Sequence, residues 1–338
     1  MSNVRRVDPR WLIALLALLL PLALLAALSV GSSGFSLPQL WRGLSGESDH
    51  VAAIIWQIRL PRVLLAAAVG AVLALCGAVM QGLFRNPLAD PSLIGVSSGA
   101  SVGASVAIVV AASWLPQAIG LPLTALAAFA GGLIATLLVY RLATSATGTS
   151  VATMLLAGIA ITALAGAAGS LLSYFADNIT LRRISLWQMG SLSGAGLDRA
   201  LLMSALALLL GVWLPRYARP LNALLLGESE ARHLGIAVQR VKRQLIVLSA
   251  LGVGSAVATA GMVAFVGLVV PHMVRMLAGP DHRFLLPASA LGGALLLVLA
   301  DTLARTVIAP VELPTGIITA LLGAPFFVAL LYQQRTRI

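Results

Sequence analysis

The sequence predicts an all-α polytopic membrane protein with about ten transmembrane helices. Of its 338 residues, 59% are hydrophobic and only 10% are charged, which is less charge than a soluble domain of this length carries. The mean hydropathy is +0.99. Several apolar runs reach the roughly 20 residues that cross a bilayer core. Together these observations favour a chain that crosses the membrane many times.

The first apolar segment follows a basic N-terminus, as the core of a signal peptide does. Arg5, Arg6 and Arg10 precede an apolar run at 11–28. This run is longer than a typical signal core, and further apolar segments follow it. We therefore expect a retained first helix at 11–30, with its N-terminus in the cytoplasm.

The later apolar segments predict nine further helices. Pro271 and Pro325 lie inside two of them, and such breaks are tolerated where the backbone faces protein or a water-filled cavity. Small residues such as Gly99 and Gly103 let neighbouring backbones approach closely. The nine expected helices are 58–82, 93–112, 118–141, 150–174, 198–215, 239–261, 263–278, 284–307 and 313–333.

Basic residues orient these helices. With the N-terminus inside, fifteen of the 22 Lys and Arg residues fall on the cytoplasmic side and seven on the outer side. Cytoplasmic loops carry such an excess. An even number of crossings returns the C-terminus to the cytoplasm. The formal charge of +11 is thus explained by orientation signals rather than by nucleic-acid binding.

Signatures of enzymes are absent from the sequence. The single cysteine, Cys76, excludes a disulfide framework within the chain and a cysteine metal site. There is no Gly-x-Ser-x-Gly, His-Glu-x-x-His or phosphate-loop pattern. The four histidines are far apart in sequence. We expect no catalysis, no metal and no cofactor in this chain.

Few ionisable residues lie deep in the expected helices. Ion-coupled carriers use intramembrane acids as proton or sodium relays. The one candidate is Asp301, four residues before Arg305 on the same helix face. We favour a salt bridge at the helix end over a relay, because no second acid accompanies it. Without such ion coupling, the energy for transport must come from another source, or the chain needs no energy source.

One polar island, 216–243, interrupts the apolar pattern. Gly227 and Gly235 bracket a short helix-like turn between them. Such a turn could act as a rigid lever on a soluble partner, although charge runs are usually ordinary solvated loops. Lys242, the only lysine, does not follow a phosphate-binding loop, so any ATP must bind another subunit. We expect one transmembrane domain over 1–338, with the island as its cytoplasmic coupling segment.

The order of several short motifs resembles the permease subunits of FecCD-type ABC importers, which carry vitamin B12, haem or ferric siderophores. The motifs cover nearly the whole chain, so the resemblance is specific although each motif is weak. They are Trp-Gln-Ile-Arg-Leu-Pro-Arg at 56–62, Gly-Ala-Val-Met-Gln at 77–81, Asn-Pro-Leu-Ala-Asp-Pro at 86–91, Leu-Ile-Gly-Val-Ser-Ser-Gly-Ala at 93–100, Leu-Ala-Gly at 156–158, Trp-Gln-Met-Gly-Ser-Leu at 187–192, the centre of the island at 226–235, Phe-Val-Gly-Leu-Val-Val-Pro-His at 265–272, Asp-His-Arg at 281–283, Leu-Ala-Asp at 299–301, Glu-Leu-Pro-Thr-Gly at 312–316 and Gly-Ala-Pro at 323–325.

The resemblance implies roles for individual residues. The centre of the island looks like the coupling helix that docks on an ATPase, with Gly227, Glu228, Ala231, Arg232, Leu234 and Gly235. Outer arginines look like the contacts to a periplasmic binding protein, although snorkelling or headgroup contact would also explain them; they are Arg59, Arg62 and Arg305. Two loops resemble inner gates, the first at Asn86 and Leu88 and the second at Ser150 and Val151. The family often has a Ser/Thr pair in the second loop, and this chain departs from it.

The implied protein is a type II ABC importer permease in the bacterial inner membrane. A homodimer would assemble with two cytoplasmic ATPases that bind ATP-Mg and with one periplasmic binding protein. It would import a bulky metal chelate, with ferric siderophores and cobalamin among the alternatives. Arg182 and Arg183, expected on the outer side, could attract carboxylates such as haem propionates, which favours haem. Two other readings remain open, an ion-coupled secondary transporter and a non-transporting scaffold or channel subunit.

Overall fold

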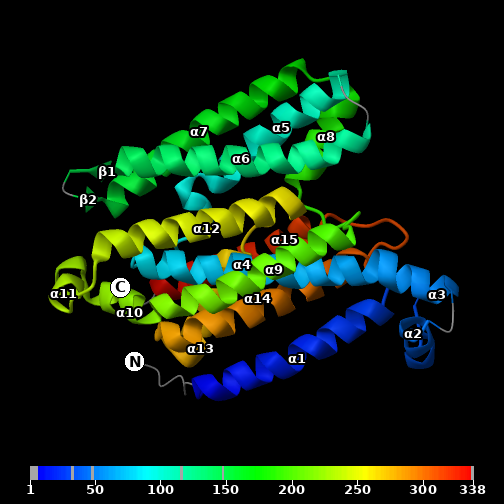
Figure 1. Cartoon of the computed structure of the whole chain (residues 1–338), viewed down its shortest axis with the longest axis horizontal. Helices are drawn as coiled ribbons and strands as arrows, with labels where there is room; N and C mark the ends of the chain where they lie inside the picture. The colour runs from blue at the N-terminus through cyan, green and yellow to red at the C-terminus, as the bar shows by residue number, and fades with distance from the viewer. Residues whose placement is uncertain (1–6, 32–33, 47–48, 115–116, 147, 336–338) are drawn as a thin grey trace. The chain divides into compact units, whose positions relative to one another are not determined.

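The computed structural model describes residues 7–31, 34–46, 49–114, 117–146 and 148–335. Within these ranges, seven helices are long and apolar enough to cross a membrane, and three shorter apolar helices accompany them. Each of the ten expected helices corresponds to one of these ten (Figure 1). The predicted all-α polytopic fold is therefore confirmed.

The chain divides into two compact units. Unit 1 comprises Met1–Ala78, Leu192–Arg219 and Val263–Ile338, and unit 2 comprises Val79–Ser191 and Pro220–Met262. The chain enters each unit more than once. Each unit is therefore assembled from segments that lie far apart in the sequence.

Unit 1 is built around α14 (His282–Ala304). The helices α1 (Pro9–Ser29), α13 (Val266–Ala278) and α15 (Thr315–Arg335) all pack against α14. The apolar span His50–Leu83 runs from α3 through the π-helical η1 into α4, so it begins earlier than the expected helix at 58. The other elements with residues in this unit are α2 (Leu37–Leu44), α3 (Asp49–Ala53), η1 (Ile54–Arg59), α4 (Leu60–Leu83), α9 (Leu197–Trp213) and η3 (Leu214–Tyr217).

Unit 2 is built around the pair α5 (Val96–Trp114) and α6 (Gln117–Ala143). Gly99 of α5 and Gly131 of α6 lie so close that a Cβ atom on either would collide with the backbone of the other. The small residues thus allow two backbones to meet, as the sequence predicts. The other helices with residues in this unit are the end of α4, η2 (Pro91–Ile94), α7 (Val151–Phe175), α8 (Asn178–Gln188), α10 (Ala218–Leu226), α11 (Glu228–His233) and α12 (Val238–Ala260).

A short antiparallel hairpin connects α6 to α7. Its strands are β1 (Thr144–Ser145) and β2 (Gly148–Thr149), and Thr144 pairs with Thr149. The Thr144 and Thr149 hydroxyls also lie 3.0 Å apart. The hairpin therefore fixes the chain that leads into the second predicted gate.

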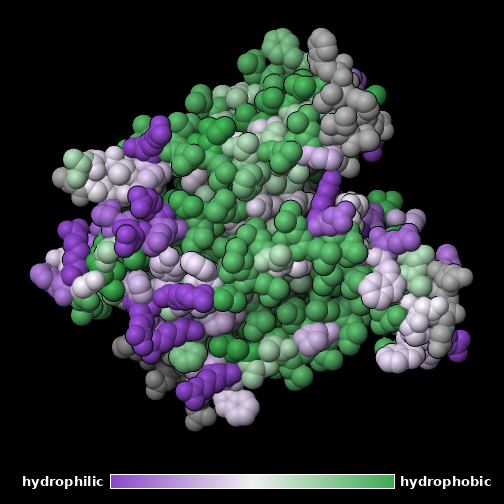
Figure 2. Space-filling model, viewed as in Figure 1, coloured by the Kyte–Doolittle hydropathy of each residue, from purple (hydrophilic) through white to green (hydrophobic). Residues whose placement is uncertain are grey.

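Large apolar side chains cover the surface of unit 2. Leu137, Leu156 and Leu164 are all more than half exposed, and Figure 2 shows apolar side chains over the visible face of α6 and α7. Soluble monomers rarely expose contiguous apolar patches of more than a few hundred Å². The apolar surface of unit 2 is therefore suited to contact with the hydrocarbon chains of a lipid bilayer.

Candidate functional site

The predicted coupling turn is the helix α11. Gly227 precedes it with φ +128°, and Gly235 follows it with φ +79°. Residues that carry a side chain rarely adopt such positive φ angles, whereas glycine adopts them freely. The two glycines therefore let the chain turn sharply into and out of a helix of only six residues.

Part of α11 faces the protein and part faces outward. Ala231 is fully buried and anchors the helix, whereas Leu234 is 63% exposed. Arg232 is exposed as well. Figure 2 shows hydrophilic side chains gathered near α11, in contrast to the apolar face of α6 and α7. The helix and Leu234, the residue that follows it, thus present a charged surface with one exposed leucine.

A buried lysine joins α11 to the hairpin. Lys242 of α12 forms an ion pair with Glu228, the first residue of α11, and its Nζ donates a hydrogen bond to the Thr149 carbonyl at 2.8 Å. Arg232 Nη2 lies 3.8 Å from the other oxygen of the Glu228 carboxylate. Because the Lys242 side chain is only 2% exposed, its ammonium is held by protein groups.

The first predicted gate is a tight turn after α4. The Asn86 side-chain oxygen accepts a hydrogen bond from the Leu88 N–H at 2.9 Å, and the Asn86 carbonyl accepts one from Ala89 at 3.1 Å. An asparagine side chain that accepts a hydrogen bond from the backbone two residues further along stabilises a turn. The loop continues into η2, whose first turn is capped by Asp90 through the Ser92 N–H at 2.8 Å.

The second predicted gate is the start of α7. Ser150 is the N-cap, and its hydroxyl accepts a hydrogen bond from the Thr153 N–H at 3.3 Å. Its own N–H donates to the Ala143 carbonyl at 2.9 Å, while Val151 opens the helix. Unit 2 therefore contains the predicted coupling helix and both predicted gate loops. Figure 1 shows α11 and the hairpin near the same end of α12.

The three outer arginines are buried in unit 1. Arg62 forms a two-pronged ion pair with Asp301, at 2.9 and 3.0 Å, and a second ion pair with Glu312 at 2.7 Å. Asp301 is 1% exposed and also accepts a hydrogen bond from the Thr315 hydroxyl at 2.9 Å. The cluster thus connects α4, α14 and the start of α15.

The other two arginines hold the end of α1. Arg59 donates to the carbonyls of Leu28 and Ser29 at 2.6 and 3.0 Å, and its guanidinium lies 4.2 Å from the centre of the Phe35 ring. Arg305 donates to the Ala27 carbonyl. The predicted Asp301–Arg305 pair is present at 3.6 Å, but Arg62 is the closer partner of Asp301. A docking role for the three arginines stays a prediction.

Sequence reasoning missed two members of this cluster, Glu312 and Thr315. The only signal was indirect, since a carboxylate buried in a span needs a partner. Arg62 lies 239 positions before Asp301, and nothing in the local spacing links them. The packing of α4 against α14 brings the two together.

Arg182 and Arg183, the residues predicted to attract the substrate, lie exposed on α8. Asp177 caps this helix by accepting the Thr180 N–H at 2.7 Å. Hydrogen bonds from Thr180 hold the pKa of Asp177 below its ordinary value, and Arg183 adds a smaller effect in the same direction. The helix is thus short, capped and basic on its surface.

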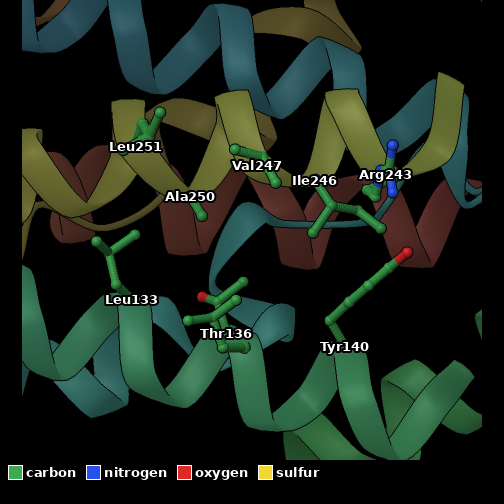
Figure 3. A pocket seen from close by; sticks show the side chains of 9 residues that line it. Leu133, Thr136, Tyr140, Arg243, Ile246, Val247, Ala250 and Leu251 are labelled. Carbon is green, nitrogen blue, oxygen red and sulfur yellow. The ribbon is translucent and has the colours of Figure 1, made fainter. Parts of the chain in front are cut away.

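An apolar cavity lies between α6 and α12 in unit 2. Its volume is about 230 Å³, and Figure 3 shows Leu133, Thr136 and Tyr140 of α6 facing Ile246 and Ala250 of α12. Pockets for drug-sized ligands typically have volumes of about 300–1,000 Å³. This cavity is too small for a bulky chelate, so it is not a candidate for the transported molecule.

Metal-ligating side chains do not converge in the part of the chain that the structure describes. Within it, no group of three or more His, Cys, Asp or Glu residues is placed to hold a metal ion. The absence of a resident metal therefore stays a prediction.

Comparison with known proteins gives matches over nearly the full length. The model of the FecCD transport family matches residues 18–333. The hemin transport system permease protein HmuU of Yersinia pestis is 47% identical over 330 residues, which cover 98% of each chain. The vitamin B12 import system permease protein BtuC of Salmonella typhimurium is 44% identical over 331 residues, covering 98% of this chain and 97% of that protein.

Solved structures agree with these relatives. An inward-facing conformation of an ABC transporter of the metal-chelate type is 35% identical, has a TM-score of 0.85, and is matched over 96% of this chain and 99% of that one. PsaBC of Streptococcus pneumoniae, at 19% identity and a TM-score of 0.54 over 83% and 94% of the chains, shares the fold alone. The full-length match, the helical architecture and the related sequences agree, and the chain belongs to the FecCD transport family.

Proposed function

We propose that this chain is the membrane permease of an ATP-driven importer that moves a bulky metal chelate from the periplasm to the cytoplasm. The observation that carries the proposal is the match over 98% of the chain to a hemin permease at 47% identity. The exposed helix α11 at the centre of the polar island supports it. The chain itself performs no covalent chemistry.

The working assembly contains two copies of this chain, two cytoplasmic ATPases and one periplasmic binding protein. ATP-Mg binds the ATPases, because the sequence has no phosphate-binding loop. The whole chain acts as one transmembrane domain in the inner membrane, with both termini in the cytoplasm. The excess of basic residues in the expected cytoplasmic loops supports this orientation.

Coupling runs through α11. Its exposed Arg232 and Leu234 dock on an ATPase, and association of the two ATPases tilts the helix. The gate loops at Asn86 and Leu88 and at Ser150 and Val151 then open and close the inner side of the pathway. Their location in the same unit as α11 supports a direct mechanical connection.

Docking of the binding protein uses the outer arginines. The cluster contains three cations, Arg59, Arg62 and Arg305, against the two carboxylates of Asp301 and Glu312. The excess positive charge would attract acidic groups on a partner and orient it.

Haem is the favoured substrate. The relatives that match this chain include a hemin permease and a vitamin B12 permease, so cobalamin and ferric siderophores remain the alternatives. The exposed pair Arg182 and Arg183 would attract carboxylates such as haem propionates.

An ion-coupled carrier fits this chain less well. The one carboxylate deep in an expected span, Asp301, is bound by Arg62 and the Thr315 hydroxyl. A relay needs an acid that can meet its ion or proton along a pathway, whereas Arg62 binds both oxygens of Asp301 within the chain.

Reconstitution tests the function. Proteoliposomes that contain the permease, its ATPase and its binding protein should accumulate haem when ATP is supplied, and not when only a proton or sodium gradient is supplied. Uptake driven by a gradient without ATP would support a secondary carrier, and no uptake under any condition would support a scaffold. Thermal stabilisation of the binding protein by haem, cobalamin or ferric chelates identifies the substrate.

A further inference from the structure

Lys242 is a buried cation whose partners come from two functional segments. It is 1% exposed, so its ammonium is shielded from solvent and depends on protein groups. Its Nζ donates to the Thr149 carbonyl at 2.8 Å and pairs with the Glu228 carboxylate. An unpaired ammonium in such a place is strongly unfavourable. The lysine therefore holds both segments to α12.

The Thr149 backbone is held from both sides. Gln239, one turn before Lys242 on the same face of α12, accepts a hydrogen bond from the Thr149 N–H at 3.0 Å. Lys242 donates to the carbonyl of the same residue. Gly148 also lies against Gln239, since a Cβ atom at position 148 would collide with the Gln239 amide.

The held residue leads directly into α7. Ser150, the next residue, caps α7 and bonds the end of α6 through the Ala143 carbonyl at 2.9 Å. A displacement of the Thr149 backbone therefore displaces the N-terminus of α7. The same turn of α12 contacts α11 through the ion pair between Lys242 and Glu228. A displacement of α11 is therefore transmitted to this turn of α12.

We infer that Lys242 is a positioning residue that makes α11, the first turn of α12 and the paired strands β1 and β2 move as one body. The inference rests on the proposed function in assigning coupling to α11 and a gate to the start of α7. The lysine gives the motion of the coupling helix a direct path to one of the two gates.

The test compares Lys242→Met with Gln244→Met in the reconstituted importer. Both changes introduce the same side chain into α12, and Gln244 is exposed. Lys242→Met should lower the uptake per ATP hydrolysed by roughly fivefold or more, while hydrolysis continues. Gln244→Met should leave the ratio unchanged. A normal ratio in Lys242→Met, in a system where the wild type transports, overturns the inference and leaves the proposed function intact.

Hydrogen exchange of the permease in nanodiscs supplies a readout that does not depend on transport. Lys242→Met should speed exchange at 144–153 and in α11 while leaving α5 and α6 as in wild type. Uniformly faster exchange, or no change at the hairpin, contradicts a local link. If Lys242→Met fails to fold, Lys242→Arg keeps the buried charge but changes the geometry of both contacts, and the inference then expects faster exchange at β1, β2 and α11 in that variant; unchanged exchange there would contradict it.

Exchanging the charges at positions 228 and 242 distinguishes the effect of the ion pair with Glu228 from that of the hydrogen bond to the Thr149 carbonyl. Glu228→Lys combined with Lys242→Glu restores an ion pair of reversed sign, but it sets a carboxylate against the Thr149 carbonyl. Uptake per ATP should remain low in this variant. Full recovery would mean that only the ion pair matters and would overturn the link to the hairpin.

Discussion

At the scale of single residues, the charges inside this protein are held by specific partners. Asp301 accepts bonds from Arg62 and Thr315, and Lys242 lies between Glu228 and Thr149. Removing one member of such a pair leaves the other buried without its partner. The largest effects of single substitutions on stability are therefore expected at these positions.

Asp301→Ala should lower the free energy of unfolding by about 3–5 kcal/mol, the cost of breaking a buried ion pair. The matched control is Asp198→Ala, because Asp198 is an exposed acid in the first turn of α9 and should contribute only about 0.3–1 kcal/mol. Denaturation in detergent measures the free energy of unfolding of both variants. Equal stability of the two variants would mean that the Arg62–Asp301 pair contributes little.

Arg59→Gln tests the docking role. The amide can still donate to carbonyls near Leu28 and Ser29, but the charge is lost. The binding protein should associate roughly tenfold or more weakly at low salt, because hydrogen bonds to charged groups contribute about 1.5–3 kcal/mol. Arg42→Gln, on exposed α2, should bind as wild type does. Titrations at low and high salt measure both variants. Unchanged affinity in Arg59→Gln would leave that arginine a role within the chain only.

At the scale of helices, apolar runs predicted the spans well. They could not predict α2 and α8, because these helices are short and carry no long apolar run. The sixth expected helix, 198–215, ended too early, since the apolar helical span continues through η3 and α10 to Leu226. Boundaries also moved where backbone geometry overrides hydropathy. The third helix begins at Val96 and not at 93, since Gly95 adopts φ +80° after the turn η2.

Part of the candidate site was also readable from the sequence. The two glycines around α11 predicted its limits, because few other residues fit the turns. The hairpin and the contacts of Lys242 could not be predicted. They join residues 14 and 93 positions away from the lysine, and only tertiary packing brings these together.

The cap of α8 predicts a dependence on pH. Asp177 has a pKa below its ordinary value, so its ionised cap stabilises α8 fully above the unfolded pKa of about 3.9 and less as the pH falls through the folded pKa. Amide exchange in α8, corrected for intrinsic rates, should therefore accelerate in acid. Asp177→Asn keeps a good cap that does not titrate and should remove this dependence. The same acid response in both would assign it to another group.

The proposed gate role of the loop at Asn86 and Leu88 predicts that the contact between its two copies changes with the nucleotide bound to the ATPases. Leu88→Cys, in a Cys76→Ala background, should crosslink between the two copies of the chain in the proposed dimer in one nucleotide state and not in another. The turn held by Asn86 places position 88 outside the spans. Equal crosslinking in the nucleotide-free, ATP-bound and post-hydrolysis states would indicate a fixed connection between helices.

At the scale of the whole molecule, the predicted site residues fall in two compact units. Unit 1 contains the cluster of Arg59, Arg62 and Arg305, and unit 2 contains α11, both predicted gate loops and α8. Apolar helices in both units provide the membrane-spanning part.

The central claim is that α11 couples ATP hydrolysis to transport, and its most direct test is the uptake per ATP hydrolysed in proteoliposomes. The Arg232→Ala, Leu234→Ala double variant changes only exposed side chains, so it should insert normally, but it should show a ratio lower by about 5- to 150-fold, which corresponds to a coupling free energy of roughly 1–3 kcal/mol. Arg42→Gln serves as the control and should keep the wild-type ratio. Normal coupled transport by the double variant would contradict the account.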